Sequence, residues 1–163
     1  MKHFKNICLF LLIANSLQLI ATSCTNIDLY EKSVTIPGHA WKSSYKPSFH
    51  FTIKDSSSLY QLFLVLRHND KYSFNNIYIN LYAQFPGGDS LKKITRDLTL
   101  ATNEEGWRGG GGTGMDDIYE HRLKLGEPEP LKAGNYTFTI EQIMREDPLR
   151  NVLNVGLRIE KKQ

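Results

Sequence analysis

Cysteine is scarce in this chain of 163 residues, which contains only Cys8 and Cys24. Both lie at the N-terminal end, and no cysteine follows them. The remaining residues can therefore form no disulfide framework, no thiolate nucleophile and no cysteine-ligated metal site. Any stabilising or reactive group in that part must come from other side chains.

A long apolar run is also missing. The most apolar segment, Ile7–Ile20, is interrupted by polar residues such as Asn15 and Gln18. A membrane-spanning helix needs about 20 mostly apolar residues, so this segment is too short and too polar. Because Lys2 and Lys5 precede it, the segment has the organisation of a secretory signal peptide, with a basic start and an apolar centre.

The residues before Cys24 are small. The sequence Ala-Thr-Ser-Cys at residues 21–24 resembles a bacterial lipobox, although Ala21 stands where leucine is more usual. The resemblance implies that signal cleavage makes Cys24 the first residue and that this cysteine carries a lipid anchor. An ordinary signal peptide with an incidental cysteine is the alternative.

This interpretation divides the chain into three parts. Residues 1–23 are a lipoprotein signal peptide, residues 24–30 are a lipidated tether, and residues 31–163 form one domain, which is long enough to bury a core. Acyl chains on Cys24 would hold the domain to a membrane without a protein span.

Strong net charge is absent as well. The formal net charge is +3 at pH 7, and the signal segment contributes Lys2 and Lys5 without any acidic residue. The domain is therefore close to neutral and carries no basic stripe. Nucleic acid is excluded as an expected partner.

Helical periodicity is missing too, and alternation of apolar and polar residues takes its place. Eight segments have the composition of strands, and residues rich in Gly, Pro, Asn and Asp separate them. The best helical candidate, EQIMREDPL at 141–149, is limited to a turn or two by Pro148. The pattern predicts an all-β, single-domain antiparallel β-sandwich, with a jelly roll as one form it can take. The predicted strands are EKSVTI (31–36), SFHFTI (48–53), LYQLFLVLR (59–67), NIYINLYAQF (76–85), RDLTLA (96–101), DIYEHRLKL (117–125), NYTFTIEQI (135–143) and VLNVGLRIE (152–160).

Five longer segments of the domain are distinctive. They are NIDLYEK, YQLFLVLRHNDKYSFNNIYINLY, DLTLATNEEGW, GMDDIYEHRLKL and AGNYTFTIEQIMREDPLRNVLNVGLRIEK. Together they resemble the gliding motility lipoprotein GldH family of Bacteroidota. They extend over essentially the whole domain and follow the order found in the family, although the glycine run GGGGTG is longer than the usual connection in the family.

The resemblance implies a lipid-anchored cell-envelope protein that acts with other Gld-type lipoproteins and with components of the type IX secretion and motility apparatus. Non-gliding relatives also carry members of the family. No catalytic residue can be carried over, so we expect no enzymatic activity and no cofactor. The residues after Cys24 lack an acidic cluster and a directly following aspartate, which favours the periplasmic face of the outer membrane.

The stretch GWRGGGGTGMDDIYEHR, residues 106–122, contains the most unusual composition. A phosphate-binding loop is excluded because no Lys-Ser or Lys-Thr follows the glycines and two aspartates do. A metal site is not expected either. On a strand only Asp117 and His121 would share a face, with Asp116 and Glu120 on the other side.

We therefore predict that this stretch is a loop that binds a partner or a ligand. Its glycines would let the loop change shape on contact, because glycine adopts dihedral angles that other residues avoid. The candidate residues are Trp107, Gly109, Gly110, Gly111, Gly112, Gly114, Asp116 and Asp117.

Alternatives to a partner-binding protein remain open at this point. A carbohydrate-binding β-sandwich lipoprotein would use exposed aromatic side chains, but the interpretation that we favour for Trp41 and Trp107 is that they close the ends of the core, where aromatic rings bury a large area. An acid–base pair of His68 and Asp70 has only Ser73 nearby, without a mark of activation. The charged segment 141–150 would serve as a docking surface or as a solvated connection. The aromatic candidates are Trp41, Trp107, Tyr45, Tyr72, Tyr78 and Tyr82.

Overall fold

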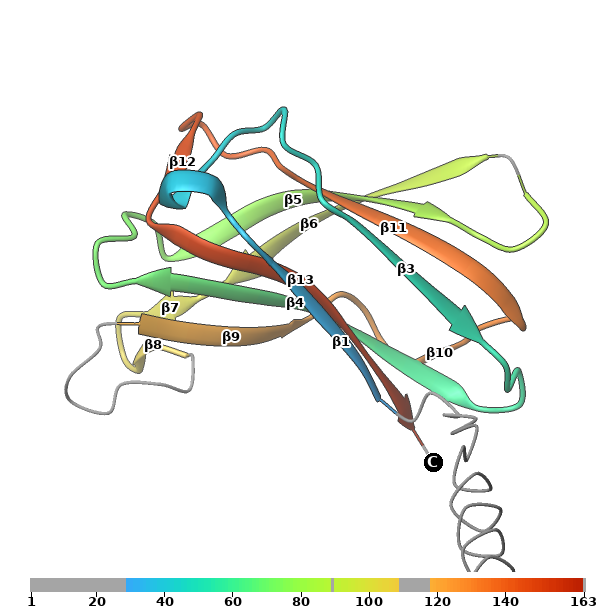
Figure 1. The fold of residues 1–163 in the computed structure, drawn as a ribbon. Coiled ribbons are helices and arrows are strands. Elements are labelled where there is room, and N and C mark those ends of the chain that lie inside the picture. Colours follow the sequence, from blue (N-terminus) through green and yellow to red (C-terminus); the bar gives the residue numbers. More distant parts are fainter. Residues whose placement is uncertain (1–28, 89, 109–117, 163) are drawn as a thin grey trace, which may run out of the picture.

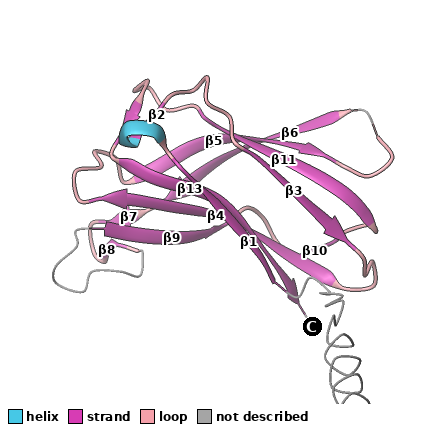
Figure 2. Cartoon of the chain, viewed as in Figure 1, coloured by secondary structure: helices cyan, strands magenta, loops and turns pink. Residues whose placement is uncertain are grey.

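The computed structural model of the chain describes residues 29–88, 90–108 and 118–162. These residues form two packed antiparallel β-sheets (Figure 1). Apart from one 3-10 turn, η1 (Pro37–His39), every regular element among them is a strand (Figure 2). The all-β sandwich predicted from alternation is confirmed.

One layer is the β4 sheet, in which the strand order is β1–β13–β4, with β9 and β10 pairing along the other edge of β4. All of these pairs are antiparallel. The bounds are β1 (Leu29–Thr35), β13 (Val152–Lys162), β4 (Leu59–Asn69), β9 (Ile118–Lys124) and β10 (Glu129–Pro130).

The other layer is the β5 sheet, with the order β3–β11–β5–β6, also antiparallel throughout. Among the described strands, β6 pairs only with β5, so it forms one edge of this sheet. The bounds are β3 (Ser48–Ile53), β11 (Gly134–Gln142), β5 (Asn76–Gln84) and β6 (Leu91–Thr99).

The long strands pass between the two sheets in the order of a jelly roll. Along the chain, β1, β4, β9 and β13 enter the β4 sheet, and β3, β5, β6 and β11 enter the β5 sheet. Two short ribbons lie at one end of the sandwich, near the C-terminal end of β4 (Figure 1). Strand β2 (Ala40–Trp41) pairs with β12 (Leu149–Arg150), and β7 (Ala101–Thr102) pairs with β8 (Gly106–Trp107).

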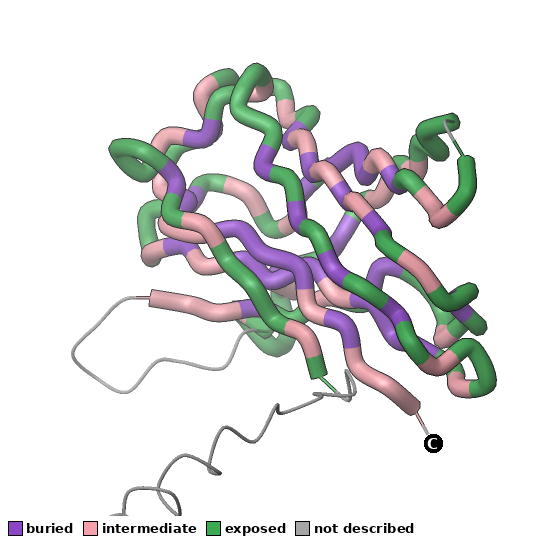
Figure 3. The backbone as a smooth tube through the Cα atoms, turned by 45° about the vertical axis from the view of Figure 1, so that its right-hand side comes forward, coloured by how far each residue is buried: buried purple, intermediate pink, exposed green. Residues whose placement is uncertain are grey.

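The core lies between the sheets and follows the alternation of the sequence. On β5, Ile77, Ile79 and Leu81 are buried, and Tyr78 and Tyr82 lie on the outer face. Strand β4 is buried on both faces, as its continuous apolar run predicted, because outward-facing Val65 is also buried. Figure 3 colours the chain by burial and shows buried residues alternating with exposed ones along strands such as β3.

The structure corrects two local predictions. Strand β6 begins at Leu91, five residues before the predicted start, because its polar first half hides the strand periodicity. The inward-facing positions of that half include Lys92, where alternation alone would place an apolar residue. The segment 143–148 forms bends and no helical turn.

Candidate functional site

The glycine stretch is described at its two ends. Trp107 closes β8, and β9 begins at Ile118. The predicted loop residues Gly109, Gly110, Gly111, Gly112, Gly114, Asp116 and Asp117 lie outside the described residues, so their role stays a prediction.

Trp107 is partly buried and packs against an aromatic cluster, which we name the Trp107 cluster. Its ring centroid lies 4.5 Å from that of His68 and 5.4 Å from that of Tyr119. The rings of Tyr72 and His121 are each 6.3 Å away. The indole is therefore held by β4, β9 and the turn after β4. This agrees with the prediction that a tryptophan here covers one end of the core.

Two buried histidines lie at the centre of the Trp107 cluster. The rings of His68 on β4 and His121 on β9 stack at 4.9 Å, and their Nε2 atoms are 2.8 Å apart. The Asn69 carbonyl can only accept, so His68 Nδ1 donates to it at 2.7 Å. The neutral His68 Nε2 is then an acceptor, and His121 Nε2 must donate to it. His121 Nδ1 is left as a buried lone pair without a hydrogen-bond partner among the described residues.

Burial keeps both histidines uncharged at neutral pH. It lowers the pKa of His68, although the bond to the Asn69 carbonyl opposes this. The pKa of His121 falls to about 4, mainly through burial and also through repulsion from His68. An uncharged pair is the expected arrangement because a buried imidazolium would need a counter-charge.

The geometry of this pair does not support catalysis or metal binding by the described residues. His68 points into the sandwich, whereas Asp70 and Ser73 are exposed, so the predicted acid–base group is not assembled. Glu120 lies on the opposite face of β9 from His121 and pairs with Arg67 and Arg122. No group of three or more His, Cys, Asp or Glu able to hold a metal occurs in the described part of the chain.

The aromatic residues predicted for sugar stacking are distributed over different environments. Trp41 is fully buried and its Nε1 donates to the Tyr45 carbonyl at 2.8 Å. Tyr72 is 4% exposed and its hydroxyl donates to the Asn76 carbonyl. Neither ring can stack on a sugar. Tyr45 and Tyr78 are the exposed members of the set, and Tyr82 uses its hydroxyl to bond Glu141.

A second candidate site lies on the outer face of the β5 sheet. Tyr78 and Ile143 are 42% and 39% exposed, and together with Phe74 and Met144 they line an open depression of about 400 Å³, which Arg145 borders. Most other large apolar side chains of the described residues are buried. We name this feature the Tyr78 depression.

The backbone fixes the shape of the Tyr78 depression. Ile143 N–H donates to the Tyr78 carbonyl at 3.0 Å, and Tyr78 N–H points at Met144 Sδ at 3.2 Å. Further along the same connection, Asp147 accepts bonds from the backbone and side chain of Ser43, which lowers the pKa of its carboxyl. The charged segment 141–150 is thus held against the β5 sheet and presents Ile143 to solvent.

Sequence comparison identifies the family of the chain. The pattern described as GldH lipoprotein matches residues 28–159. The chain belongs to the GldH lipoprotein family. The resemblance seen in the quoted segments is therefore confirmed. GldH is not a known enzyme family, and a family of lipoproteins implies a location in the cell envelope. The helices of the described residues include none that could span a membrane.

Two GldH relatives are similar over most of their length. The gliding motility lipoprotein GldH of Flavobacterium johnsoniae is 30% identical, with 98% of this chain and 99% of the relative covered. The gliding motility lipoprotein GldH homolog of Christiangramia forsetii is 28% identical, with 88% of this chain and 90% of the relative covered.

Solved structures resemble this GldH member only weakly. A carbohydrate-binding module specific for non-crystalline cellulose aligns with a TM-score of 0.44 and 14% identity, covering 82% of this chain and 73% of the module. Dimeric latent PorU from Porphyromonas gingivalis aligns with a TM-score of 0.34 and 12% identity, covering 87% of this chain and 14% of PorU.

Sequence reasoning missed two features: the pairing of His68 with His121, and the Tyr78 depression. His121 had been considered as a metal ligand and His68 as a partner of Asp70, but not as a pair. The signal was present in the alternation, which places His68 on the face of Leu64 and Leu66 and His121 on the face of Leu123. The docking role considered for segment 141–150 pointed to the region of the Tyr78 depression.

Proposed function

We propose that this chain is a lipid-anchored accessory protein of the cell envelope, associated with gliding motility and with the type IX secretion apparatus, and that it acts by protein–protein contact. Lipid on Cys24 would confine the domain to the membrane surface and raise its effective concentration near membrane partners. The proposed location is the periplasmic face of the outer membrane.

The observation that carries this proposal is the Tyr78 depression. Contiguous apolar surface on a protein often marks a contact site, and Tyr78 and Ile143 lie exposed in one depression with Phe74 and Met144. Asn76 and Arg145 also line the depression, so it combines apolar and polar groups as contact surfaces do. The relatives named for gliding motility support the choice of partners.

In-cell cross-linking followed by pull-down and mass spectrometry tests the proposal. Four forms of the tagged full chain are compared: wild type, Cys24→Ala, Ile143→Asp and Leu59→Asp. Leu59 is the matched control because it is a 45% exposed apolar residue on the other sheet. We expect wild type and Leu59→Asp to recover Gld-type lipoproteins or type IX secretion components, and the other two forms to lose them.

The outcomes separate anchoring from surface contact. Recovery that persists in Ile143→Asp would show that the Tyr78 depression is not the contact surface. Recovery that persists in Cys24→Ala would remove the proposed role of the lipid. If wild type recovers none of these proteins while being expressed and folded, the protein-contact function itself is wrong and the carbohydrate-binding alternative takes its place.

A further inference from the structure

The free edge of β6 can accept another strand. The Leu100 N–H donates to the Asn75 carbonyl on the β5 side, and the pairing of β6 with β5 continues without a register shift. Backbone groups of successive residues in a strand point to opposite edges. Lys93, Thr95 and Asp97 therefore present their N–H and C=O groups to the open side, where no described strand pairs with them.

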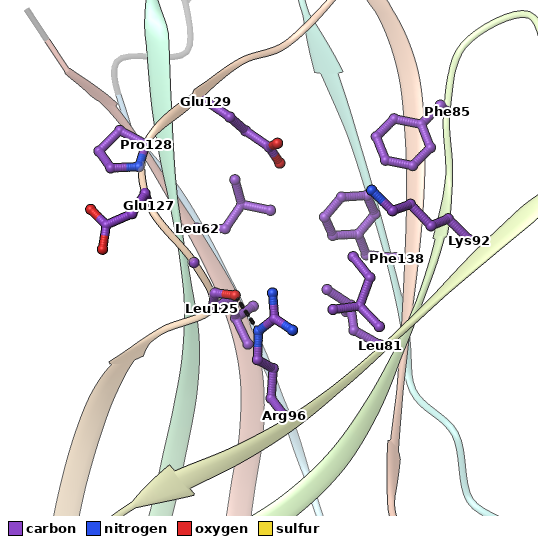
Figure 4. Close-up of a pocket in the computed structure, with 12 residues that line it drawn as sticks. Leu62, Leu81, Phe85, Lys92, Arg96, Leu125, Glu127, Pro128, Glu129 and Phe138 are labelled. Atoms are coloured by element: carbon purple, nitrogen blue, oxygen red, sulfur yellow. Dashed lines mark hydrogen bonds between the residues drawn. The ribbon is translucent and has the colours of Figure 1, made fainter.

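A pocket lies directly beside this edge. It occupies about 280 Å³ between β6 and the connection from β9 to β10 (Figure 4). A cavity of about 150 Å³ holds a benzene molecule, and sites for drug-sized ligands span roughly 300–1,000 Å³. The pocket thus has room for one large side chain and is small for an oligosaccharide. Its apolar lining consists of Leu62, Leu81, Phe85, Ile94, Leu125 and Phe138.

Two cations point from β6 into the pocket, as Figure 4 shows for Lys92 and Arg96. Arg96 is held in place because its Nε donates to the Leu125 carbonyl at 2.7 Å. Its Nη1 donates to the Thr95 carbonyl at 3.0 Å, which leaves that oxygen a second lone pair for a strand. Lys92 makes no hydrogen bond or ion pair with any described residue. Glu127 and Glu129 lie on the opposite wall.

Inward-pointing charges on an edge strand prevent pairing with arbitrary strands, since most strands would bury the charge without a partner. An added strand lies about 4.8 Å from its neighbour, so its inward side chains would touch those of β6. A strand that brings carboxylates beside Lys92 and Arg96 would pair with both cations. A second copy of β6 would bring two more cations and is disfavoured.

We propose that β6 binds an extended segment of another protein as an additional strand of the β5 sheet. Three alternate residues of that segment face inward: a large apolar residue fills the pocket beside Ile94, and acidic residues flank it beside Lys92 and Arg96. The inference rests on the proposed function, protein contact, and names the chemistry of one contacting segment. It concerns a surface separate from the Tyr78 depression.

The test is hydrogen–deuterium exchange of the full-length protein in detergent with a synthetic peptide, Thr-Glu-Thr-Phe-Thr-Glu-Thr, at millimolar concentration. We expect exchange of the segment 91–99 to slow at least about threefold, which corresponds to roughly 0.7 kcal/mol. Control peptides replace both Glu by Lys, or Phe by Ser, and should give no slowing. Equal slowing by the lysine peptide, or none by the glutamate peptide, would overturn the proposal.

A charge exchange in the protein provides a second readout. The Lys92→Glu variant should show weaker slowing of exchange with the glutamate peptide and should now show slowing with the lysine peptide. The control Lys93→Glu, on the outer face of the same strand, should still respond to the glutamate peptide and not to the lysine peptide. If exchange of the segment 91–99 slows with increasing protein concentration in the absence of peptide, the occupant of the β6 edge is a second copy of this chain. That result would refute the proposal that a different protein binds there. If neither the glutamate peptide nor the charge-exchanged Lys92→Glu variant gives the expected result while the pull-down is positive, the proposed function stays intact and only the β6 contact is removed.

Discussion

On the outer face of the β4 sheet, charged side chains form a continuous series of ion pairs, whereas on β3 and β11 of the β5 sheet the outward side chains form neutral pairs. Glu31 contacts Arg122 and Arg158, and Arg122 also pairs with Glu120 at 2.7 Å. On β3 and β11 of the other sheet, Ser48 pairs with Thr139 at 2.7 Å, and His50 and Thr52 pair across in the same way.

The difference indicates which face is available for contact. Charges on the β4 sheet satisfy one another, so a partner there would have to separate existing pairs. On the β5 sheet, Glu141 accepts from Asn80, Tyr82 and Lys46, and the pKa of its carboxyl falls to about 2 because of these donors. The rest of that face leaves Tyr78 and Ile143 uncovered.

The largest stability effect should come from the charged face, at Gly156 on β13. A Cβ at this position would lie 2.2 Å from Ser33 Oγ and 2.6 Å from the Lys32 carbonyl oxygen, so Gly156→Ala forces β1 away from β13. We expect a loss of about 1–3 kcal/mol in the free energy of unfolding, measured with urea. Gly88→Ala, where the nearest atom is 3.9 Å away, should change it by less than about 0.5 kcal/mol. Equal effects would mean that the β1–β13 contact is loose.

A contrast between an inner and an outer histidine should appear in the pH dependence of stability. The lowered pKa of His121 means that the unfolded chain takes up a proton near pH 6.5 while the folded chain does not until about pH 4. Stability must therefore fall as the pH drops from 7 to 5, by about 1–2 kcal/mol for this group.

Urea unfolding at pH 7 and pH 5 measures this contribution. The His121→Gln variant should lose most of the pH dependence of stability that His121 contributes, whatever the absolute stability of the variant. His50→Gln, on the exposed outer face of β3, should keep the wild-type pH dependence. The same pH dependence in all three proteins would show that His121 is accessible to protons in the folded state.

Salt should distinguish the carboxylates of the two outer faces. Glu31 is bound by two cations, and ionic strength screens such contacts. Glu141 receives two of its three bonds from uncharged donors, Asn80 and Tyr82, which salt screens less. At low salt we expect Glu31→Gln and Glu141→Gln each to cost about 1 kcal/mol. In about 0.5 M salt, the loss in free energy of unfolding caused by Glu31→Gln should fall by about half, whereas the loss caused by Glu141→Gln should persist. A parallel decline would contradict the contrast.

The smallest stability effect is expected at the proposed contact surface. Ile143→Ser removes an exposed apolar side chain, so the free energy of unfolding should change by less than about 0.5 kcal/mol. Thermal unfolding of the purified protein measures it. A loss above about 1 kcal/mol, which is twice the expected maximum, would mark Ile143 as part of the core and weaken its assignment to partner contact.

Much of the fold could be predicted because a two-sheet sandwich imposes period-two burial on each strand. SFHFTI has the predicted bounds of β3, and the other long strands differ at their ends. The first half of β6 escaped prediction because Lys92 occupies an inward position at the open edge, where solvent still reaches a charged group. Alternation cannot identify such a position without knowledge of which strand lies at the edge.

The candidate site was less predictable than the fold. Composition drew attention to the glycine stretch, and the structure describes only Trp107 of its predicted residues. The His68–His121 pair joins strands 53 residues apart, and its spacing depends on the register between β4 and β9. The Tyr78 depression likewise joins β5 to the connection after β11. Contacts between distant segments depend on which strands pair and in which register, and the local pattern of a single sequence does not specify this.

The position of β13 has a consequence for biogenesis. Among the described strands it comes after all the others in the sequence, yet it lies between β1 and β4 and contacts both along their length. The β4 sheet therefore cannot close while the chain is still emerging from a ribosome or a membrane channel, because its central strand arrives last. Until then β1 and the apolar β4 lack their shared neighbour. Such exposed strands are prone to wrong pairing, so we expect the nascent domain to depend on a holding chaperone until Lys162 has emerged.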